Sequence, residues 1–460
     1  MIKVTPELLA RYDRPGPRYT SYPTAVEFRE DFGPAQYAER LAEAAGDPEA
    51  ALSLYVHLPF CEARCSFCGC HVVVARRRSV ADVYLDRVIA EADLLAQHLG
   101  ERRTLAQYHW GGGTPTYYSP GDLARLHKAI LRRFEPAPGA EVALEVDPRV
   151  TTVEHLEALR ELGFNRLSLG VQDCDAVVQD LIGRHQSWEQ THRFFESARS
   201  LGFSSINVDL IYGLPGQSEA SFADTIEKMV GLRPDRLAVY SFAYVPWVRP
   251  NQKRIDPETL PDRDLKFALL AQVMEGFTSA GYRQIGMDHF ALPDDELAIA
   301  ADEGTLHRNF MGYTTKRDAE MVALGTSGIS DVAGAYAQNH KRLASYYRSV
   351  DAGELPVERG VVLSFDDRVR RYVITELMCN SRVSAAQVEL RFSVNFAEYF
   401  ADELTLLATD PGLDGLVEVG TGEVRAVGLG ELFIRNVAMA FDAYLKHHQE
   451  KPQPVFSRTL

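Results

Sequence analysis

The chain has 460 residues, of which 46% are hydrophobic and 25% are charged, so we expect a folded protein with a sizeable core. Its net charge of −15 reflects 49 basic against 64 acidic side chains. This charge excludes a general binder of nucleic acid or of anionic membranes, because both partners need a basic surface. An acidic small substrate is compatible with it, since such a substrate needs only a local basic pocket.

The first 50 residues are predicted to form a separate, extended arm. They contain Pro15, Pro17 and Pro23, and proline favours extended backbone over helix. The arm has no apolar run of the kind found in signal peptides, and no later stretch reaches the roughly 20 apolar residues of a membrane span. We therefore expect a cytoplasmic protein whose cysteines stay reduced.

The next 250 residues or so, 51–300, alternate short apolar runs with amphipathic stretches, which indicates repeated strand–helix units and a parallel sheet. The apolar runs, interpreted as strands buried on both faces, are 53–58, 106–110, 141–146, 166–170, 206–213 and 236–242. The amphipathic stretches, interpreted as helices, are 80–99, 122–134, 153–162, 188–201 and 222–232. An open doubly wound sheet and a full or partial barrel both fit this order.

Residues suited to chemistry follow these predicted strands. The cysteines come after the first strand, and the later strands are followed by Gly111–Thr116, Asp147, Gln172 with Asp173, and 215–216. Because the carboxyl ends of parallel strands meet at one edge of a sheet or barrel, we expect the functional site at that edge.

The pattern from 255 to 365 is mixed and rich in loops. Beyond it, helices are predicted at 366–379, 385–390, 395–407 and 429–448, with a hairpin around 420–422. Helices followed by a hairpin resemble a winged helix. DNA binding is not favoured, because the helix at 385–390 has no Lys or Arg and acidic residues follow it.

Four of the six cysteines lie between Cys61 and Cys70, which in a reducing compartment indicates metal or redox chemistry. Cys61, Cys65 and Cys68 are separated by three and two residues, so one loop can bring their thiolates to one metal centre. Iron–sulfur clusters are held by such thiolates, and three ligands leave one iron of a four-iron cluster open. Cys70 is a candidate fourth ligand, a catalytic thiol or a bystander.

Structural zinc is the alternative for this segment. Zinc sites usually include a second Cys or His pair a dozen or more residues away, and none follows here. His57 and His71 are nevertheless close enough to compete as ligands. The isolated Cys174 and Cys379 are interpreted as small, partly buried hydrophobic side chains.

The order Cys61, Cys65, Phe67 and Cys68 after a predicted first strand resembles the signature of the radical S-adenosylmethionine (SAM) superfamily. The resemblance implies a 4Fe–4S cluster on the three cysteines, with SAM chelating the open iron. It also implies that Phe67 lies near the adenine of SAM.

Further segments resemble one family, the oxygen-independent coproporphyrinogen III oxidases. They are RYDRPGPRYT at 11–20, the Cys-x-Cys extension to Cys70, HWGGGTPT at 109–116, EVDPR at 145–149, GVQD at 170–173, DLIYGLP at 209–215, GMDHF at 286–290 and HRNFMGYTT at 307–315. A related haem chaperone lacks the Cys-x-Cys extension and the Asn-Phe-x-Gly-Tyr-Thr-Thr segment, so the oxidase is favoured.

The resemblance implies an α/β fold with four parts. These are an N-terminal arm covering the site at 1–50, a partial (β/α)6 barrel of the triosephosphate-isomerase type at 51–300, a connecting segment contributing to the site at 301–365, and a mostly helical, winged-helix-like domain at 366–460.

The resemblance also implies two SAM molecules and assigns residues to each. The cluster-bound SAM would contact Tyr55, Phe67, Gly112, Glu145 and Ile329. The second SAM would contact Gly113, Thr114, Gln172, Arg184, Asp209 and Ala243. The residue types fit these roles, because glycines allow close backbone approach and a carboxylate accepts hydrogen bonds from an amine.

The implied reaction converts two propionates of coproporphyrinogen III to vinyls by oxidative decarboxylation, giving protoporphyrinogen IX in haem biosynthesis. A SAM-derived 5′-deoxyadenosyl radical starts it, and a low-potential donor of flavodoxin or ferredoxin type supplies electrons. A monomer is expected, as are the absence of nucleic-acid and membrane partners. The alternatives are a haem chaperone and another radical SAM enzyme acting on a tetrapyrrole. Propionates favour arginine and lysine, and the candidates are Arg11, Arg14, Arg18, Arg249, Lys253, Arg254 and Arg308.

Overall fold

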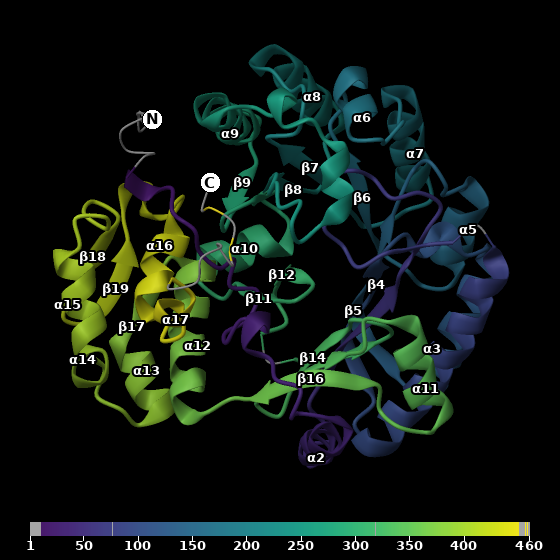
Figure 1. Cartoon of the computed structure of the whole chain (residues 1–460), viewed down its shortest axis with the longest axis horizontal. Helices are drawn as coiled ribbons and strands as arrows, with labels where there is room; N and C mark the ends of the chain where they lie inside the picture. The colour runs from purple at the N-terminus through teal and green to yellow at the C-terminus, as the bar shows by residue number, and fades with distance from the viewer. Residues whose placement is uncertain (1–10, 76, 318, 450–455, 457, 459–460) are drawn as a thin grey trace. The chain divides into compact units, whose positions relative to one another are not determined.

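The computed structural model describes residues 11–75, 77–317, 319–449, 456 and 458, and these form two compact units (Figure 1). The larger unit contains residues 28–280 and 318–362. The smaller unit contains residues 281–317 and 363–460, together with residues up to Glu27, as far as these are described. Each unit is thus assembled from segments that are far apart in the sequence.

The larger unit is built on a parallel sheet (Figure 1). Within the described residues six strands run parallel in the order β1 (Leu52–Leu58), β4 (Thr104–Gly112), β5 (Glu135–Val146), β6 (Arg166–Gln172), β7 (Ser205–Tyr212) and β8 (Arg236–Ser241). They are largely buried on both faces, as their apolar sequences predict. Because β1 and β8 are not neighbours, the six strands form a partial barrel, which confirms the expected fold class.

Helices connect these strands. Those at the predicted places are α3 (Arg78–Leu99), α4 (Pro120–Leu131), α5 (Val153–Glu161), α7 (Trp188–Ser200) and α8 (Glu219–Leu232). The short helix α6 (Ala176–Leu181) and the helix α9 (Arg263–Ser279), which follows the last strand, were not predicted. Helix α4 shows why they begin where they do: Ser119 caps it by accepting a hydrogen bond from Asp122 N at 3.2 Å, and Pro120 occupies its first turn.

The sheet continues on the other side of β1, which the sequence did not predict. Strand β13 (Glu320–Leu324) pairs parallel with β1, and β14 (Ile329–Val332), β15 (Ala335–Asn339) and β16 (Val357–Val362) add to it antiparallel. The helix α11 (Leu343–Asp351) connects the last two of these strands. Only a mixed, loop-rich region was expected here, because these short strands depend on a partner far back in the sequence.

The expectation of an extended N-terminal arm is wrong for part of its length. Residues 34–44 form the helix α2 (Pro34–Ala44), which begins with proline and buries Tyr37, Leu41 and Ala44. Proline is favourable in the first turn of a helix, so Pro34 starts this helix rather than preventing it. The short elements η1 (Ala25–Glu27), β2 (Phe60–Cys61), β3 (Val73–Val74), η2 (Pro115–Tyr117), η3 (Pro250–Arg254) and η4 (Pro257–Thr259) complete this part of the chain.

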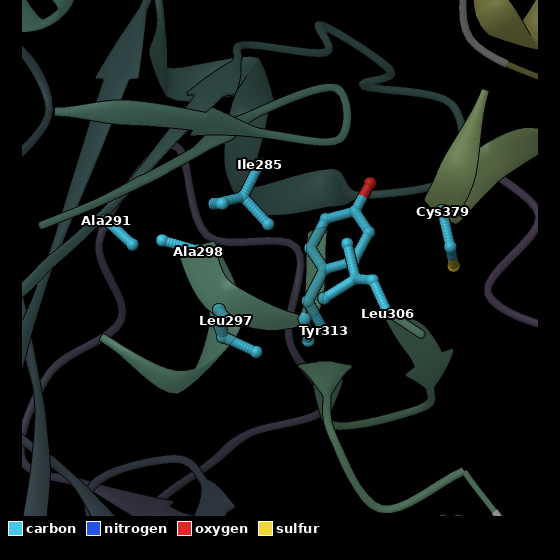
Figure 2. Close-up of a cluster of buried hydrophobic side chains, with 8 residues drawn as sticks. Ile285, Ala291, Leu297, Ala298, Leu306, Tyr313 and Cys379 are labelled. Atoms are coloured by element: carbon cyan, nitrogen blue, oxygen red, sulfur yellow. The ribbon is translucent and has the colours of Figure 1, made fainter. Parts of the chain in front are cut away.

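Residues 281–317 of the smaller unit form two hairpins with a helix between them. The elements are β9 (Arg283–Ile285), β10 (His289–Ala291), α10 (Glu296–Glu303), β11 (His307–Asn309) and β12 (Gly312–Thr314). Figure 2 shows their buried apolar cluster, in which Tyr313, Leu306 and Ile285 lie together with Cys379. Cys379 is therefore a small buried hydrophobic side chain, as predicted, and burial raises the pKa of its thiol to about 12.

The C-terminal part of the smaller unit is mostly helical, as expected, with a three-stranded sheet in the order β17, β19, β18. Its elements are α12 (Phe365–Asn380), β17 (Arg382–Ser384), α13 (Ala385–Phe392), α14 (Phe396–Tyr399), α15 (Ala401–Thr409), β18 (Val417–Val419), β19 (Glu423–Ala426), η5 (Gly428–Gly430), α16 (Ile434–Ala438), η6 (Met439–Phe441) and α17 (Leu445–Gln449).

Two predicted helices of this part are interrupted. The helix at 395–407 divides at Phe400, and the helix at 429–448 is a series of short turns. Contacts with the N-terminal residues explain the second break. Tyr19 donates to the Asp442 carboxylate at 2.9 Å, and Ala443 N donates to the Tyr22 hydroxyl at 3.0 Å, so Asp442 adopts extended backbone. Among the described helices, none is long and apolar enough to cross a membrane.

Candidate active site

The cysteines lie in a loop that leaves the carboxyl end of β1 and returns to the same place. The loop is closed at its base, because Phe60 pairs with Val73 and Cys61 with Val74. Closing the loop in this way keeps Cys61, Cys65 and Cys68 on one short turn of chain. All six cysteines of the chain are free thiols.

A cavity of about 370 Å³ opens between this loop and the carboxyl ends of β4 to β8. The expected site residues that line it are Cys61, Cys65, Cys68, Phe67, Gly112, Gly113, Thr114, Glu145, Gln172, Arg184 and Asp209. The lining also includes Asp147, which was expected near the strand ends, and Arg64, Arg149, Ser168, Gly170 and Tyr240. Cys70, whose role was left open, also lines the cavity.

The glycines at the end of β4 allow neighbouring groups, among them the His57 ring and the Pro59 carbonyl, to approach the strand closely. A Cβ on Gly112 would lie 2.5 Å from the His57 ring, and one on Gly113 would lie 2.5 Å from the Pro59 carbonyl oxygen. Gly112 also has φ +117°, which side chains disfavour. Gly113 N donates to the Leu58 carbonyl at 2.9 Å, so the glycine segment is attached to the base of the cysteine loop.

Glu145 presents a negative charge to the cavity. Gly112 N donates to its Oε2 at 2.9 Å, and His109 Nε2 lies 3.8 Å from its Oε1. Burial acts to raise the pKa of Glu145, but His109 and the Gly112 amide outweigh it, so the pKa is lowered. A carboxylate held ionised in a cavity suits a cationic amine.

Asp147, Arg149 and Arg184 form a charged group against the cysteine loop. Arg149 donates to both Asp147 oxygens, from Nε at 3.0 Å and from Nη2 at 2.6 Å, and Arg184 Nη1 lies 3.4 Å away. Burial acts to raise the pKa of Asp147, but the charges of Arg184 and Arg149 lower it. Arg149 Nη2 also donates to Cys65 Sγ at 3.6 Å, so this group contacts a candidate cluster ligand directly.

Residues 55–229 match the model of the radical SAM superfamily. Oxygen-independent coproporphyrinogen III oxidase of Escherichia coli is 45% identical over 457 residues, which cover 98% of each chain. The protein of the same name from Synechocystis is 40% identical and covers all of this chain and 98% of its own. A solved structure of coproporphyrinogen III oxidase from Escherichia coli, described as a radical SAM enzyme, matches with a TM-score of 0.89 over 93% of this chain and 97% of that chain.

The chain belongs to the family of oxygen-independent coproporphyrinogen III oxidases. As a radical SAM enzyme, an oxidase of this family uses a 4Fe–4S cluster and SAM. The residues present fit both groups, because three free thiols and the Glu145 carboxylate line one cavity. The cluster would be held by Cys61, Cys65 and Cys68.

The zinc alternative finds no support in this oxidase. The match to the radical SAM superfamily implies an iron–sulfur cluster at these cysteines instead. His57 is already engaged, since its Nε2 donates to the His71 carbonyl at 3.0 Å and its Nδ1 accepts from the Tyr55 hydroxyl at 3.1 Å. Burial lowers the pKa of His57 to about 4, so its ring is neutral.

Three residues expected at the oxidase's SAM sites lie outside the lining of the cavity. Tyr55 is on β1, where its ring stacks against His109 with 6.0 Å between ring centroids. Ala243 follows β8, and its carbonyl accepts a hydrogen bond from Gln252 at 3.0 Å. Ile329 begins β14, opposite Gln338 of β15.

Proposed function

We propose that this chain catalyses the oxygen-independent oxidative decarboxylation of two propionates of coproporphyrinogen III to vinyls, giving protoporphyrinogen IX in haem biosynthesis. The observation that carries the proposal is the arrangement of the cysteine loop and Glu145 around one cavity, in a chain that matches oxidases of that name over nearly its full length. When bound, the cluster and SAM supply the radical that removes a hydrogen atom from a propionate.

The residues of the chain bind and orient these groups. Cys61, Cys65 and Cys68 hold the cluster and leave one iron open for SAM. The ionised Glu145 accepts hydrogen bonds from the SAM ammonium, in line with its lowered pKa. A second SAM occupies the same cavity, a proposal supported by the lining positions of Gln172, Arg184 and Asp209 on the side of β6 and β7.

In this proposal, the N-terminal arm, 1–50, and the connecting segment, 301–365, contribute to the binding of the substrate. Within the smaller unit these segments bring arginines together, since Arg308 Nη1 donates to the Arg18 carbonyl at 3.3 Å. Arg18 Nη1 lies 3.6 Å from Asp288. Arginine suits the propionates of coproporphyrinogen III. Arg11 and Arg14 instead contact the loop at 410–414, which makes them weaker candidates.

The same proposal includes the compartment, the oligomeric state and the electron donor of the enzyme. We place it in the cytoplasm, where its six free thiols stay reduced. We expect it to act as a monomer and to take electrons from a low-potential donor of flavodoxin or ferredoxin type.

An anaerobic incubation with SAM, reductant and coproporphyrinogen III tests the function. We expect 5′-deoxyadenosine and a vinyl-bearing product. Haem binding without decarboxylation would point to a haem chaperone, and 5′-deoxyadenosine with a different product would point to another tetrapyrrole-modifying enzyme. The absence of both products would overturn the proposal.

Replacing one cluster ligand gives the sharpest variant. Cys65→Ser should abolish SAM cleavage, because the thiolate that binds the iron is lost. Cys379→Ser changes a cysteine in the other unit and serves as the matched control, in which the cluster should still form. SAM cleavage at the normal rate by Cys65→Ser would contradict the ligand assignment.

A further inference from the structure

The backbone of the cysteine loop needs hydrogen-bond partners away from its paired base, and two neighbouring amide side chains provide them. Asn251 Nδ2 donates to the carbonyls of Cys65, Ser66 and Cys68 at 3.2, 3.0 and 3.0 Å. Gln252 Nε2 donates to the Phe67 carbonyl at 3.2 Å. The carbonyl groups of four consecutive loop residues, 65–68, therefore all bond to this amide clamp, Asn251 and Gln252.

The orientation of both amides is fixed by their surroundings. Val245 N donates to Gln252 Oε1 at 2.6 Å, while Gln252 Nε2 also donates to the Ala243 carbonyl at 3.0 Å. Asn251 Oδ1 is buried and has no partner among the described residues. A flipped Asn251 amide would place that oxygen against three carbonyl oxygens, so only the observed orientation is favourable.

The clamp lies next to a cluster of buried side chains. Both residues lie in η3, Gln252 is only 2% exposed, and the following Ile255 is buried in a cluster that includes Ile182. Phe67 packs against the same cluster, and Ser66 N donates to the Ile182 carbonyl at 2.9 Å. The cysteine loop is thus attached to a packed core through the Phe67 side chain, the Ser66 amide and the loop carbonyls that the clamp binds.

The clamp also connects two segments that follow different strands of the sheet. Strands β1 and β8 are the first and the last of the six barrel strands and are not paired with each other. The cysteine loop follows β1, whereas the clamp follows β8. The amide bonds therefore join the segment that follows the first strand of the partial barrel to the segment that follows its last strand, directly at the candidate cluster site.

We propose that Asn251 and Gln252 are positioning residues that hold the cysteine loop in the shape that binds the cluster. The role of the loop as a cluster site rests on the proposed function, whereas its attachment by the clamp does not. Without the clamp, the loop would open away from η3 while the rest of the sheet stays folded. The cluster would then be lost faster, and the loop amides would exchange with solvent.

The test replaces each amide by its closest carboxylate relative. Asn251→Asp and Gln252→Glu keep the side-chain size but put an oxygen against the loop carbonyls, which removes the donors and adds repulsion. Asn165→Asp is the matched control, because Asn165 Nδ2 also donates to a backbone carbonyl, that of Ala140 at 2.9 Å, at the amino end of β6. Asn251→Ala provides a variant without added charge if Asn251→Asp does not fold.

Two measurements decide the outcome. In the metal-free protein, hydrogen exchange over residues 65–70, where the Ser66 amide is a reporter, should be at least about tenfold faster in the clamp variants than in the wild type and Asn165→Asp. In the anaerobically reconstituted protein, iron and sulfide should be lost to a chelator faster by a similar factor. Wild-type exchange rates in all clamp variants would overturn the inference.

The two proposals fail in different ways. If the wild type assembles no 4Fe–4S cluster, the proposed function fails, and exchange in the metal-free protein still decides the clamp. If the wild type assembles the cluster and cleaves SAM but the clamp variants keep their iron and their exchange rates, only the clamp is wrong.

Discussion

Two buried carboxylates of the larger unit, Glu91 and Asp147, are both surrounded by hydrogen-bond donors, and yet their pKa values are shifted in opposite directions. Glu91 of α3 accepts from Gly325 N at 2.7 Å, from Asn339 Nδ2 at 2.6 Å and from the Tyr346 hydroxyl at 2.6 Å. All three donors are neutral, and burial raises the pKa of Glu91 to about 7. These four residues, the Glu91 network, join α3 to the residue that follows β13, to β15 and to α11.

Asp147 at the cavity is in a different situation. Its donors are the guanidinium groups of Arg149 and Arg184, and its pKa is lowered although burial acts in the opposite direction. The difference shows that neutral donors satisfy a buried carboxylate without keeping it ionised, whereas neighbouring cations do both. A fixed negative charge is therefore found at the cavity, whereas Glu91 in the network that holds the sheet extension is protonated in acid and ionises near pH 7.

Removing Asp147 should have the largest effect on stability. Asp147→Ala leaves two largely buried guanidinium groups without their carboxylate, which should lower the free energy of unfolding by about 3 kcal/mol or more. Tryptophan fluorescence during denaturant unfolding measures this, because the three tryptophans of the chain, Trp110, Trp188 and Trp247, all lie in the larger unit. A loss below about 1 kcal/mol would show that the ion pairs contribute little.

Glu91→Gln should have a smaller effect that depends on pH. The folded-state pKa of Glu91 lies above its unfolded value, so the wild type is most stable in acid and loses stability as pH rises toward about 7. The variant lacks this loss, so it should gain about 2 kcal/mol relative to the wild type between pH 5 and 8. Unfolding at a series of pH values measures the difference. A constant difference across that range would mean that Glu91 is ionised throughout.

Glu145→Gln should weaken SAM binding about tenfold in the reconstituted protein, because it removes a single charge at the cavity. Glu141→Gln is the matched control. Glu141 lies on the same strand with a lowered pKa but does not line the cavity. Equal SAM affinities for the two variants, measured by equilibrium binding, would remove Glu145 from the amine site.

The sequence allowed the parallel strands and the edge of the sheet that carries the site to be predicted, because most of the strands are nearly continuous apolar runs and polar residues follow their ends. The cysteine spacing predicted the loop. The extension from β13 to β16 could not be predicted, since its strands are short and their burial depends on pairing with β1.

The supporting residues of the site were harder to predict. Asn251 and Gln252 contact the cysteine loop from 183–186 residues away, and an Asn-Gln pair in a loop has no local signature. The Asp-x-Arg pattern at Asp147 and Arg149 did carry a signal, because an i, i+2 pair after a strand can form an ion pair. Its contact with Cys65 depends on the folded loop.

The pairing of β1 with β13 has a consequence for synthesis of the protein. Strand β1 leaves the ribosome early, but Leu52 has no partner on this side until Glu320 has been made. In between, the ribosome also makes residues 281–317, which belong to the other unit. The nascent chain therefore carries an open, apolar strand edge through most of translation. An edge of this kind recruits other chains, so fragments that end before β13 should aggregate.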